Sequence, residues 1–505
     1  MAATDASRRV AAAAKTDARE QSGPAPRSWE YVEGWGMAVG AHSRVLRPRS
    51  AAEIAACFAA AREHGCSLGL RGTGNSYGDA SINARGWVLD VSRMSRILHW
   101  DPATGVAELE PGVTVEQLWK RILPDGWWPA VVSGTAFPTV AGALAMNIHG
   151  KNNYKVGPLG DHCLEFDLVL PSGEVVTCDR ERNADLFHAA IGGFGMLGAF
   201  SRVVLKAKHV HSGDMHIKAL RSRDLGEMMR QMEERKASAD YLVGWIDCFT
   251  GGERSGRGLV HAAWHLKPGE DSASERTLSV GYQELPGSIL GFPKSEVWRI
   301  LRLLNNDPGM RLINAAKYVS GCIEAAQNAH RQSHAAFAFL LDYVPNWKFA
   351  YGTEPGRRGL IQFQSFIPHA TALETYLELL ERSRRARLVP YLGVLKRHRP
   401  DPFWMTHAVD GWSLALDFKV TPDNRSALWA HCDALTEVVI AAGGRFYFAK
   451  DLVIGPDDAR RCFPAANLAR FFELKRRLDP DLLLQTDLYR RVFGVQEAAA
   501  GSGPG

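Results

Sequence analysis

A glycine-rich segment between two short apolar runs restricts the fold more than any other feature. Residues 71–79 read RGTGNSYGD and lie between the strand-like runs SLGL and WVLDV. Because Gly72, Gly74 and Gly78 lack a Cβ atom, the backbone can take positive φ and aim successive N–H groups at one anion. Ser76 adds a hydroxyl donor. The pattern predicts a cradle for a phosphate or pyrophosphate, and a plain glycine-rich turn is the alternative.

Two familiar nucleotide-binding motifs do not fit this segment. GTGNSYG does not match GxGxxG at the start of a helix, and no acidic residue follows a second strand at the usual offset, which excludes a Rossmann site. A P-loop requires GK followed by Ser or Thr, which the segment lacks.

Length and composition describe a large globular protein. With 505 residues, the chain exceeds the roughly 250–300 residues at which a single core stops growing, so more than one packed unit is expected. Apolar residues make up 46% and charged residues 23%, which argues against a disordered or fibrous protein. The net charge of +5 is scattered, which argues against a nucleic-acid partner. The eight cysteines form no CxxC pair, so no metal site is predicted and reduced thiols are expected.

The pattern of helices and strands changes near the middle of the chain. Short strands and helices alternate from about residue 43 to 206, whereas longer strands such as GLIQFQSFIP and WSLALDFKV follow after 208, which predicts an antiparallel sheet. The interval 268–330 shows no clear period and is interpreted as a loop-rich insertion or a lid. The uncharged stretch 130–148 contains Pro138 and several small polar residues, which predict buried loop and helix start rather than a membrane span.

Three segments resemble the flavin-binding loops of the vanillyl-alcohol-oxidase-like, or PCMH-type, FAD proteins. RGTGNSYGD resembles their pyrophosphate loop, SGTAFPTVAGALAMNIHGKN their second flavin loop, and LFHAAIGGFGMLGAF the glycine segment at the adenine end. Small residues there also have a steric reason, since bulky side chains would block a planar cofactor. The resemblance implies these cofactor-binding residues: Arg71, Gly72, Thr73, Gly74, Asn75, Ser76, Tyr77, Gly78, Asp79, Gly134, Thr139, Val140, Ala141, Gly142, Met146, Asn147, Ile148, His149, Gly195, Phe200 and Tyr447.

The mode of FAD attachment follows from the same resemblance. Many family members attach FAD covalently through a histidine directly before the serine of the first loop, and here that position is Asn75. Non-covalent FAD is therefore expected. A linkage through His149, His162 or a cysteine stays open.

Within the family, most of the chain resembles the decaprenylphosphoryl-ribose 2′-oxidases, which convert a lipid-linked sugar hydroxyl to a ketone. The shared segments include GWG at 34–36, IHGKN at 148–152, VLKR at 394–397, GGRFYFAKD and LLLQTDLYRR. The resemblance places around the substrate Lys151, Gln362, Gln364, Lys396 and Ser413.

The resemblance also places Tyr77 and His149 beside the flavin and Lys450 near its reactive face, as the three residues expected to act in catalysis. When a hydride leaves a carbinol carbon, the hydroxyl proton must leave at about the same time, so a basic or cationic group near that oxygen lowers the barrier. Lys450 is the candidate for this role. The alternatives are a solvated Lys450–Asp451 pair, a structural His149, and Lys396 as part of a basic surface run.

Three positions depart from the pattern of the ribose oxidases. Where those proteins have Asn and Cys in the strand matching WSLALDF, this chain has Ser413 and Ala415, and an upstream pocket tyrosine corresponds to Ala338. These departures leave the substrate open and do not affect the flavin half of the inference.

The expected fold class is α+β, with a PCMH-type (VAO-like) bipartite FAD-binding domain and an α+β substrate cap domain built on an antiparallel sheet. The expected parts are an N-terminal extension (1–29), the FAD-binding domain (30–207), the cap domain (208–425), a C-terminal segment that returns to the flavin site (426–495) and a flexible tail (496–505).

The expected function is FAD-dependent oxidation of a secondary alcohol of a sugar or polyol, such as the 2′ hydroxyl of a polyprenyl-phosphate-linked ribose. Quinone or O₂ would accept the electrons, and a separate short-chain reductase is a candidate partner. A sugar-lactone or alditol oxidase and a sterol-type flavin reductase fit the same fold, and a non-catalytic flavin-binding protein is the alternative of another class. The expected localisation is cytoplasmic, with no transmembrane segment and with peripheral membrane contact left open.

Overall fold

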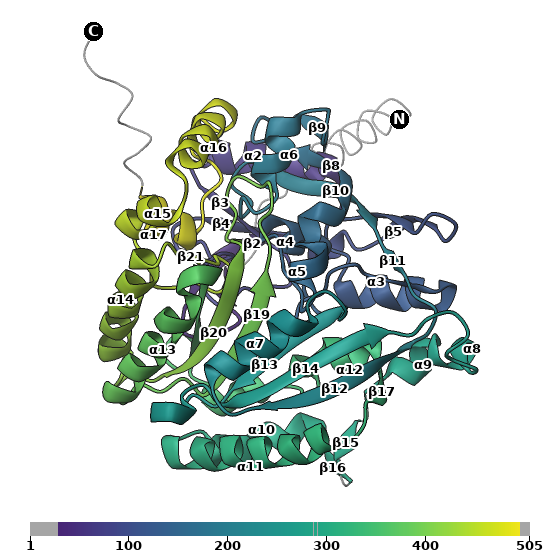
Figure 1. Ribbon diagram of the computed structural model, residues 1–505. Helices are drawn as coiled ribbons and strands as arrows, with labels where there is room; N and C mark the ends of the chain where they lie inside the picture. Colours follow the sequence, from purple (N-terminus) through teal and green to yellow (C-terminus); the bar gives the residue numbers. More distant parts are fainter. Residues whose placement is uncertain (1–28, 286, 290, 495–505) are drawn as a thin grey trace, which may run out of the picture.

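The computed structural model describes residues 29–285, 287–289 and 291–494, and its three larger β-sheets are accompanied by helices, as expected for an α+β protein (Figure 1). The expected N-terminal extension up to residue 28 and the expected tail lie outside the described residues. No helix within the described ranges is long and apolar enough to span a membrane.

The first sheet has four strands and carries the glycine-rich segment at one end. In spatial order its strands are β1 (Trp29–Glu33), β2 (Gly40–Leu46), β4 (Trp87–Asp90) and β3 (Leu68–Arg71). The last three are parallel, and the helix between β2 and β3 is α2 (Ala51–Glu63). Ser50 caps this helix by accepting a hydrogen bond from the Glu53 N–H, and Ile54 and Phe58 are fully buried.

The second sheet has five antiparallel strands. In spatial order they are β5 (Ile97–Asp101), β6 (Val106–Leu109), β10 (Ala199–Lys206), β8 (Cys163–Val169) and β9 (Val175–Asp179). The neighbouring elements are α3 (Val115–Ile122), α4 (Val140–Ala145), α5 (Asn153–Val156), α6 (Ala184–Ala190) and the short pair β7 (Trp127–Trp128) and β11 (Lys208–His209). Because α4 lies inside the stretch 130–148, the interpretation of that stretch as buried loop and helix start is confirmed.

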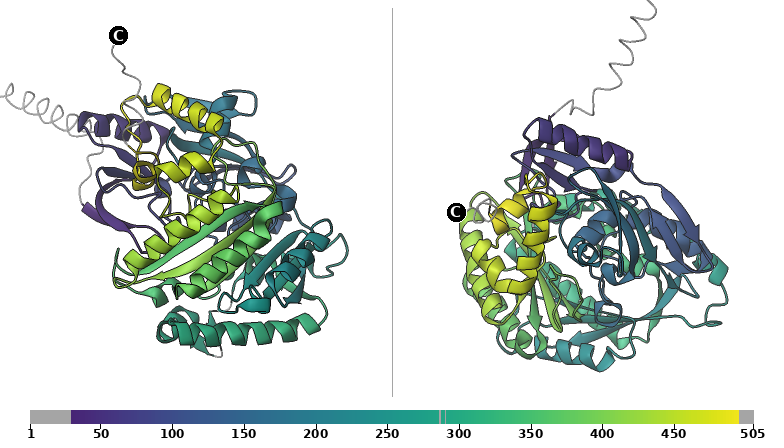
Figure 2. Two further views of the ribbon diagram at one scale, coloured as in Figure 1. Left: turned by 60° about the vertical axis from the view of Figure 1, so that its left-hand side comes forward. Right: turned by 90° about the horizontal axis from the view of Figure 1, so that it is seen from above.

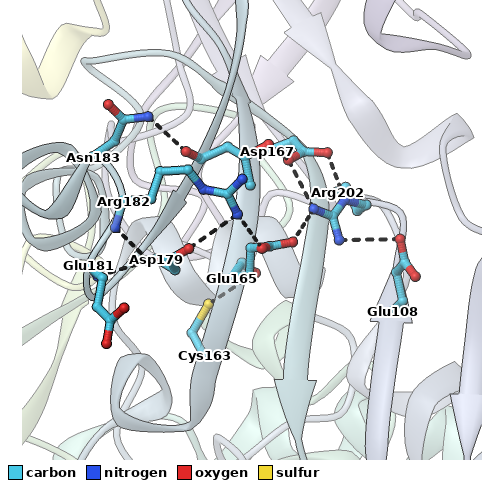
Figure 3. A network of polar contacts seen from close by, with 10 residues as sticks. Glu108, Cys163, Glu165, Asp167, Asp179, Glu181, Arg182, Asn183 and Arg202 are labelled. Carbon is cyan, nitrogen blue, oxygen red and sulfur yellow. Dashed lines mark hydrogen bonds and ion pairs between the residues drawn. The ribbon is translucent and has the colours of Figure 1, made fainter.

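An ionic network crosses the strands of this sheet (Figure 3). Arg202 on β10 pairs with Asp167 at 2.6 Å, with Glu108 at 3.2 Å and also with Glu165, so one guanidinium joins β10 to both of its neighbours. Arg182 extends the network by pairing with Glu165 at 2.7 Å. The Arg202 side chain is 21% exposed, whereas that of Arg182 is 56% exposed.

The third sheet has eight strands, all of whose neighbours are antiparallel. In spatial order they are β17 (His330–Ser333), β12 (Asp214–Ser222), β14 (Gly258–His265), β13 (Tyr241–Ile246), β19 (Leu392–His398), β20 (Gly411–Val420), β18 (Gly359–Pro368) and β21 (Arg445–Phe446). One face packs against α7 (Leu225–Arg235), α13 (His369–Arg385) and α14 (Arg425–Ala441) (Figure 2). The antiparallel sheet expected after residue 208 is therefore present, and β21 extends it beyond residue 425.

The expectation of a loop-rich interval at 268–330 was wrong for its second half. This interval contains α8 (Ser274–Thr277), α9 (Val280–Gln283), the strand pair β15 (Ser288–Ile289) and β16 (Phe292–Pro293), α10 (Val297–Leu304) and the 20-residue α11 (Asp307–Ala326), and α12 (His334–Ala338) follows β17. The Asn306 side chain caps α11 by accepting from the Gly309 N–H. The period was obscured because several apolar residues of these helices face solvent.

The segment after residue 445 returns to the first sheet, where the C-terminal helices lie beside the N-terminal part of the chain (Figure 2). These helices are α15 (Pro456–Cys462), α16 (Ala465–Leu478) and α17 (Asp487–Phe493). The Leu68 N–H donates to Leu483 O at 2.7 Å, and the Gln485 N–H donates to Leu68 O at 2.9 Å. Lys475 is buried and donates to Met196 O and Leu484 O, both at 2.8 Å.

Replacement of Arg202 by Gln is expected to lower the free energy of unfolding by about 1.5–3 kcal/mol, because three carboxylates lose a shared, mostly covered donor. The matched change Arg182→Gln, at the exposed end of the same network, should cost less than about 1 kcal/mol. Urea denaturation followed by tryptophan fluorescence measures both. Equal losses of stability in the two variants would show that Arg202 gains nothing from contacting three neighbouring strands.

Candidate active site

A cavity of about 450 Å³ lies between the eight-stranded sheet and the loops of the first half of the chain. Its wall combines the glycine-rich segment after β3, the loop and helix at 133–149, the sheet face that bears Gln362 and Gln364, and the loop at 447–450. Segments more than 370 residues apart in the sequence therefore meet at one place.

The structure brings together nearly all the residues that the sequence predicted for the site. Of the predicted cofactor-binding, substrate-binding and catalytic residues, those that do not line the cavity are Gly78, Asp79, Val140 and Asn147. Asn147 instead uses its side-chain oxygen to accept from the Gly160 N–H at 2.9 Å, and Val140 is buried in the core. These two residues therefore support the second loop from behind.

The glycine-rich loop has the geometry of an anion cradle. Gly74 has φ +71°, and a Cβ on Gly72 would lie 2.2 Å from Thr139 Oγ1, so both positions require glycine. Within the part of the chain that the structure describes, the N–H groups of residues 73–76 make no hydrogen bond to protein. Arg71 lies against Gly74 and donates to Ser81 Oγ at 2.9 Å. Free amides and a nearby guanidinium fit the pyrophosphate of FAD.

Lys450 and Tyr77 are in direct contact at the cavity wall. The Lys450 Nζ lies 3.5 Å from the centre of the Tyr77 ring, and the Tyr77 N–H donates to Ala449 O at 2.8 Å. Burial lowers the pKa of Lys450 to about 7, an effect that nearby Asp417 opposes and Lys396 reinforces. Near neutral pH, Lys450 can therefore hold or release a proton.

His149 belongs to a cluster of buried, uncharged imidazoles. Its ring centroid lies 4.8 Å from that of His398 and 5.5 Å from that of His407, and burial lowers the pKa of all three histidines well below the usual value. Gln364 Nε2 donates to His149 Nε2 at 3.1 Å, which places the His149 proton on Nδ1. That Nδ1 is buried and has no partner among the described residues, so it is a donor left for a bound molecule.

The two other predicted lysines have different surroundings. Lys396 lines the cavity, and burial lowers its pKa to about 8, whereas Arg397, the next residue on β19, pairs with Glu233 at 2.6 Å. The Lys151 Nζ donates to Phe337 O and lies 4.2 Å from the centre of the Phe337 ring. Lys151 therefore holds α12 at the wall of the cavity.

The sequence reasoning missed two polar residues behind this wall. Asp417 accepts from Gln362 Nε2 at 2.5 Å, and burial raises its pKa to about 6. His398 shares a 2.7 Å hydrogen bond with Ser413 Oγ. The two-residue repeat of a strand could have predicted both, because residues two or four apart lie on the same face. Asp417 follows Ser413 by four residues, and His398 follows Lys396 by two.

Arg491 on α17 connects two of the loops at the cavity. Its guanidinium binds both carboxylate oxygens of Asp79 at 2.9 Å and Asp451 Oδ2 at 2.8 Å. Asp79 ends the glycine-rich loop, and Asp451 directly follows Lys450. Because Asp451 is buried and pairs with Arg491, the alternative of a solvated Lys450–Asp451 pair is wrong. Asp79, predicted to bind the cofactor, binds Arg491 instead.

Comparison with known proteins agrees with this geometry. Residues 42–179 match the family model described as an FAD binding domain. Residues 42–179 thus form an FAD binding domain, and the protein is an FAD-dependent oxidoreductase with FAD as its cofactor.

The similarity extends beyond this domain. Over 483 residues the chain is 26% identical to decaprenylphosphoryl-beta-D-ribose oxidase of Mycolicibacterium smegmatis, which covers 92% of this chain and 98% of that protein. An uncharacterised protein of Streptomyces coelicolor is 27% identical over 75% of this chain and all of its own length. D-arabinono-1,4-lactone oxidase of Yarrowia lipolytica is 23% identical over 40% of this chain and 38% of its own.

Replacement of Arg491 by Leu is expected to destabilise the protein by about 3–5 kcal/mol and to weaken FAD retention, because Asp79 and Asp451 are left buried without a counter-charge. Thermal unfolding and the flavin-to-protein absorbance ratio measure the two effects. The control Arg461→Gln removes an exposed ion pair with Glu437 and should change neither.

Further replacement of both carboxylates in the Arg491→Leu variant, by Asp79→Asn and Asp451→Asn, separates charge from packing. Partial recovery of stability is expected, because the uncompensated charges are then gone. No recovery would show that Arg491 acts through its packing.

Proposed function

We propose that this protein oxidises a secondary alcohol of a sugar that carries an anionic group, with a polyprenyl-phosphate-linked pentose as the specific candidate. The charge of the cavity wall supports this proposal. Among the described residues, its lining contains three histidines and the longer basic residues Arg71, Lys151, Lys317, Lys396 and Lys450, but no aspartate or glutamate. A cationic cavity without carboxylates favours an anionic substrate over a neutral polyol.

In the proposed reaction, Lys450 takes the hydroxyl proton as its neutral amine. Bound FAD supplies the hydride acceptor. Tyr77 supports the Lys450 ammonium through its ring face, and the unpartnered His149 Nδ1–H is positioned to donate a hydrogen bond to substrate or cofactor. Gln364 and Gln362 orient His149 and Asp417 from the sheet.

The positions that depart from the ribose oxidases all line the cavity, namely Ser413, Ala415 and Ala338. The shape of the sugar subsite therefore differs, and a sugar-lactone or alditol oxidase is the second candidate, supported by the similarity to D-arabinono-1,4-lactone oxidase. That similarity covers less than half of either chain, whereas the similarity to the ribose oxidase covers nearly all of both. Reoxidation by quinone or O₂ and a separate short-chain reductase partner belong to the proposal.

Anaerobic reduction of the flavin tests the substrate class. A short-chain prenyl-phosphoryl pentose should bleach the yellow protein at least about tenfold faster than ribitol or a sugar lactone, since the loss of a charge-assisted contact costs about 1.5–3 kcal/mol. Acid precipitation of the same sample should release FAD into the supernatant, as expected for non-covalent binding with Asn75 in the first loop. Faster bleaching by a neutral polyol or lactone would favour the second candidate.

Replacement of Lys450 by Met is expected to slow flavin reduction by about 10²–10⁴-fold while leaving the flavin spectrum unchanged. In the unmodified protein the rate should rise with pH through about 7 and then level off, because the active amine forms as Lys450 loses its proton. Stopped-flow reduction across pH measures both effects.

Lys396→Met is the matched variant in the same cavity. Because the positive charge of Lys396 lowers the pKa of Lys450, its removal should move the rising limb to higher pH and raise the KM for an anionic substrate. A limb that persists unchanged in Lys450→Met would remove Lys450 as the base.

A further inference from the structure

The helical hairpin of α10 and α11 presents a row of large apolar side chains to solvent. This row, the apolar ridge, consists of Ile300, Leu303, Leu312, Val319 and Ile323, which are between 51% and 77% exposed. The hairpin lies along the lower edge of the molecule in Figure 1, at the end away from α2 and α16.

The spacing on α11 places the ridge on one face of the helix. Leu312, Ala316, Val319 and Ile323 follow one another at intervals of four, three and four residues, which is the repeat of an α-helical face. In a surface helix of a globular protein such a face normally turns toward the core. Here all four residues are exposed.

Small and polar residues form the opposite, protein-facing side of α11. Asn314 and Gly321 are buried on this side, and a Cβ on Gly321 would lie 2.1 Å from the Leu259 side chain on β14. Apart from Met310, which packs against the core, this side contributes little apolar area, whereas Leu312, Val319 and Ile323 face outward. This inverted arrangement calls for a partner on the outer face.

The charges around the ridge indicate which partner fits. Along residues 297–326, the exposed cations on the outer side are Arg299, Arg302 and Arg311, of which Arg299 also pairs with Glu296 at 2.5 Å. The acidic residues of this span are partly covered and engaged: Asp307 accepts from the Tyr391 hydroxyl at 3.0 Å, and Glu324 lies 3.9 Å from His261 Nε2. The outer surface thus combines apolar residues with cations.

We propose that the α10–α11 hairpin docks on a bilayer that contains anionic lipids, with the apolar ridge inserted at the interface and the cations against lipid headgroups. A symmetric contact with a second copy of the chain is disfavoured, because it would place these cations against each other. Lys317 on α11 lines the cavity, with its Nζ 4.6 Å from the centre of the Trp245 ring, so the cavity reaches the docking helix. In this one respect the inference rests on the proposed function: a lipid-linked sugar would enter directly from the membrane.

Vesicle flotation of the FAD-loaded protein tests the proposal. The protein should float with phosphatidylcholine vesicles that contain phosphatidylglycerol and much less with phosphatidylcholine alone. The ridge variant Leu312→Gln/Val319→Gln/Ile323→Gln should lose at least about tenfold in partitioning, since three apolar side chains no longer leave water. The charge variant Arg299→Gln/Arg302→Gln/Arg311→Gln should lose the preference for anionic vesicles.

A control replaces three exposed apolar residues on the five-stranded sheet, Leu98, Leu164 and Val175, by Gln. These residues lie on β5, β8 and β9, away from the hairpin, so vesicle binding should not change. The flavin absorbance and melting temperature of every variant report whether it is folded.

Three results would overturn the proposal: no binding of the unmodified protein to either vesicle, equal binding of the ridge variant, or a dimer in solution that the ridge variant converts to monomer without any vesicle binding. The last result would make the ridge a protein interface. Flotation is measured without substrate, and flavin reduction with short-chain substrates without vesicles. The failure of one proposal is therefore distinguishable from the failure of the other.

Discussion

The guanidinium of Arg491 lies between two buried carboxylates and thereby joins the glycine-rich loop, the Lys450 loop and α17. Buried ion pairs add little net stability compared with apolar packing, but they are costly to break, so their main effect here is on position. Since Asp79 and Asp451 are each adjacent to the cavity loops, the contact between Tyr77 and Lys450 depends on this bridge. The sheets supply the walls of the cavity, and Arg491 sets how the glycine-rich loop and the Lys450 loop meet at its edge.

Local sequence patterns predicted most of the site, because each pattern reports on a neighbourhood of a few residues. The glycine loop at 71–79 and the two-residue repeat that presents Gln362 and Gln364 are of this kind. The role of Asp79 could not be predicted, since its partner is 412 residues away. The helical interval containing α10 and α11 was missed for a different reason: its apolar face is exposed, so the usual rule for locating a core does not apply.

Burial reduces the positive charge of the cavity wall, and a bound anion would restore it. It lowers the pKa of Lys396 and Lys450 and keeps the histidine cluster around His149 neutral, so the wall loses charge as water is excluded. An anion entering the cavity would oppose this effect and favour the protonated lysines. Substrate binding and proton uptake are therefore coupled. Lys450 must be neutral to act as a base, whereas protonated lysines in the wall help to hold an anionic substrate.

The return of the chain after residue 445 to the first sheet also has a consequence for biosynthesis. A ribosome completes the FAD binding domain at 42–179 long before it reaches Lys450, the strand partner of Leu68 at 483–485 or Arg491. Until then the cavity lacks one edge and exposes apolar surface to water. Stable cofactor binding therefore requires the later segment, and folding intermediates that lack it are the species on which chaperones would act.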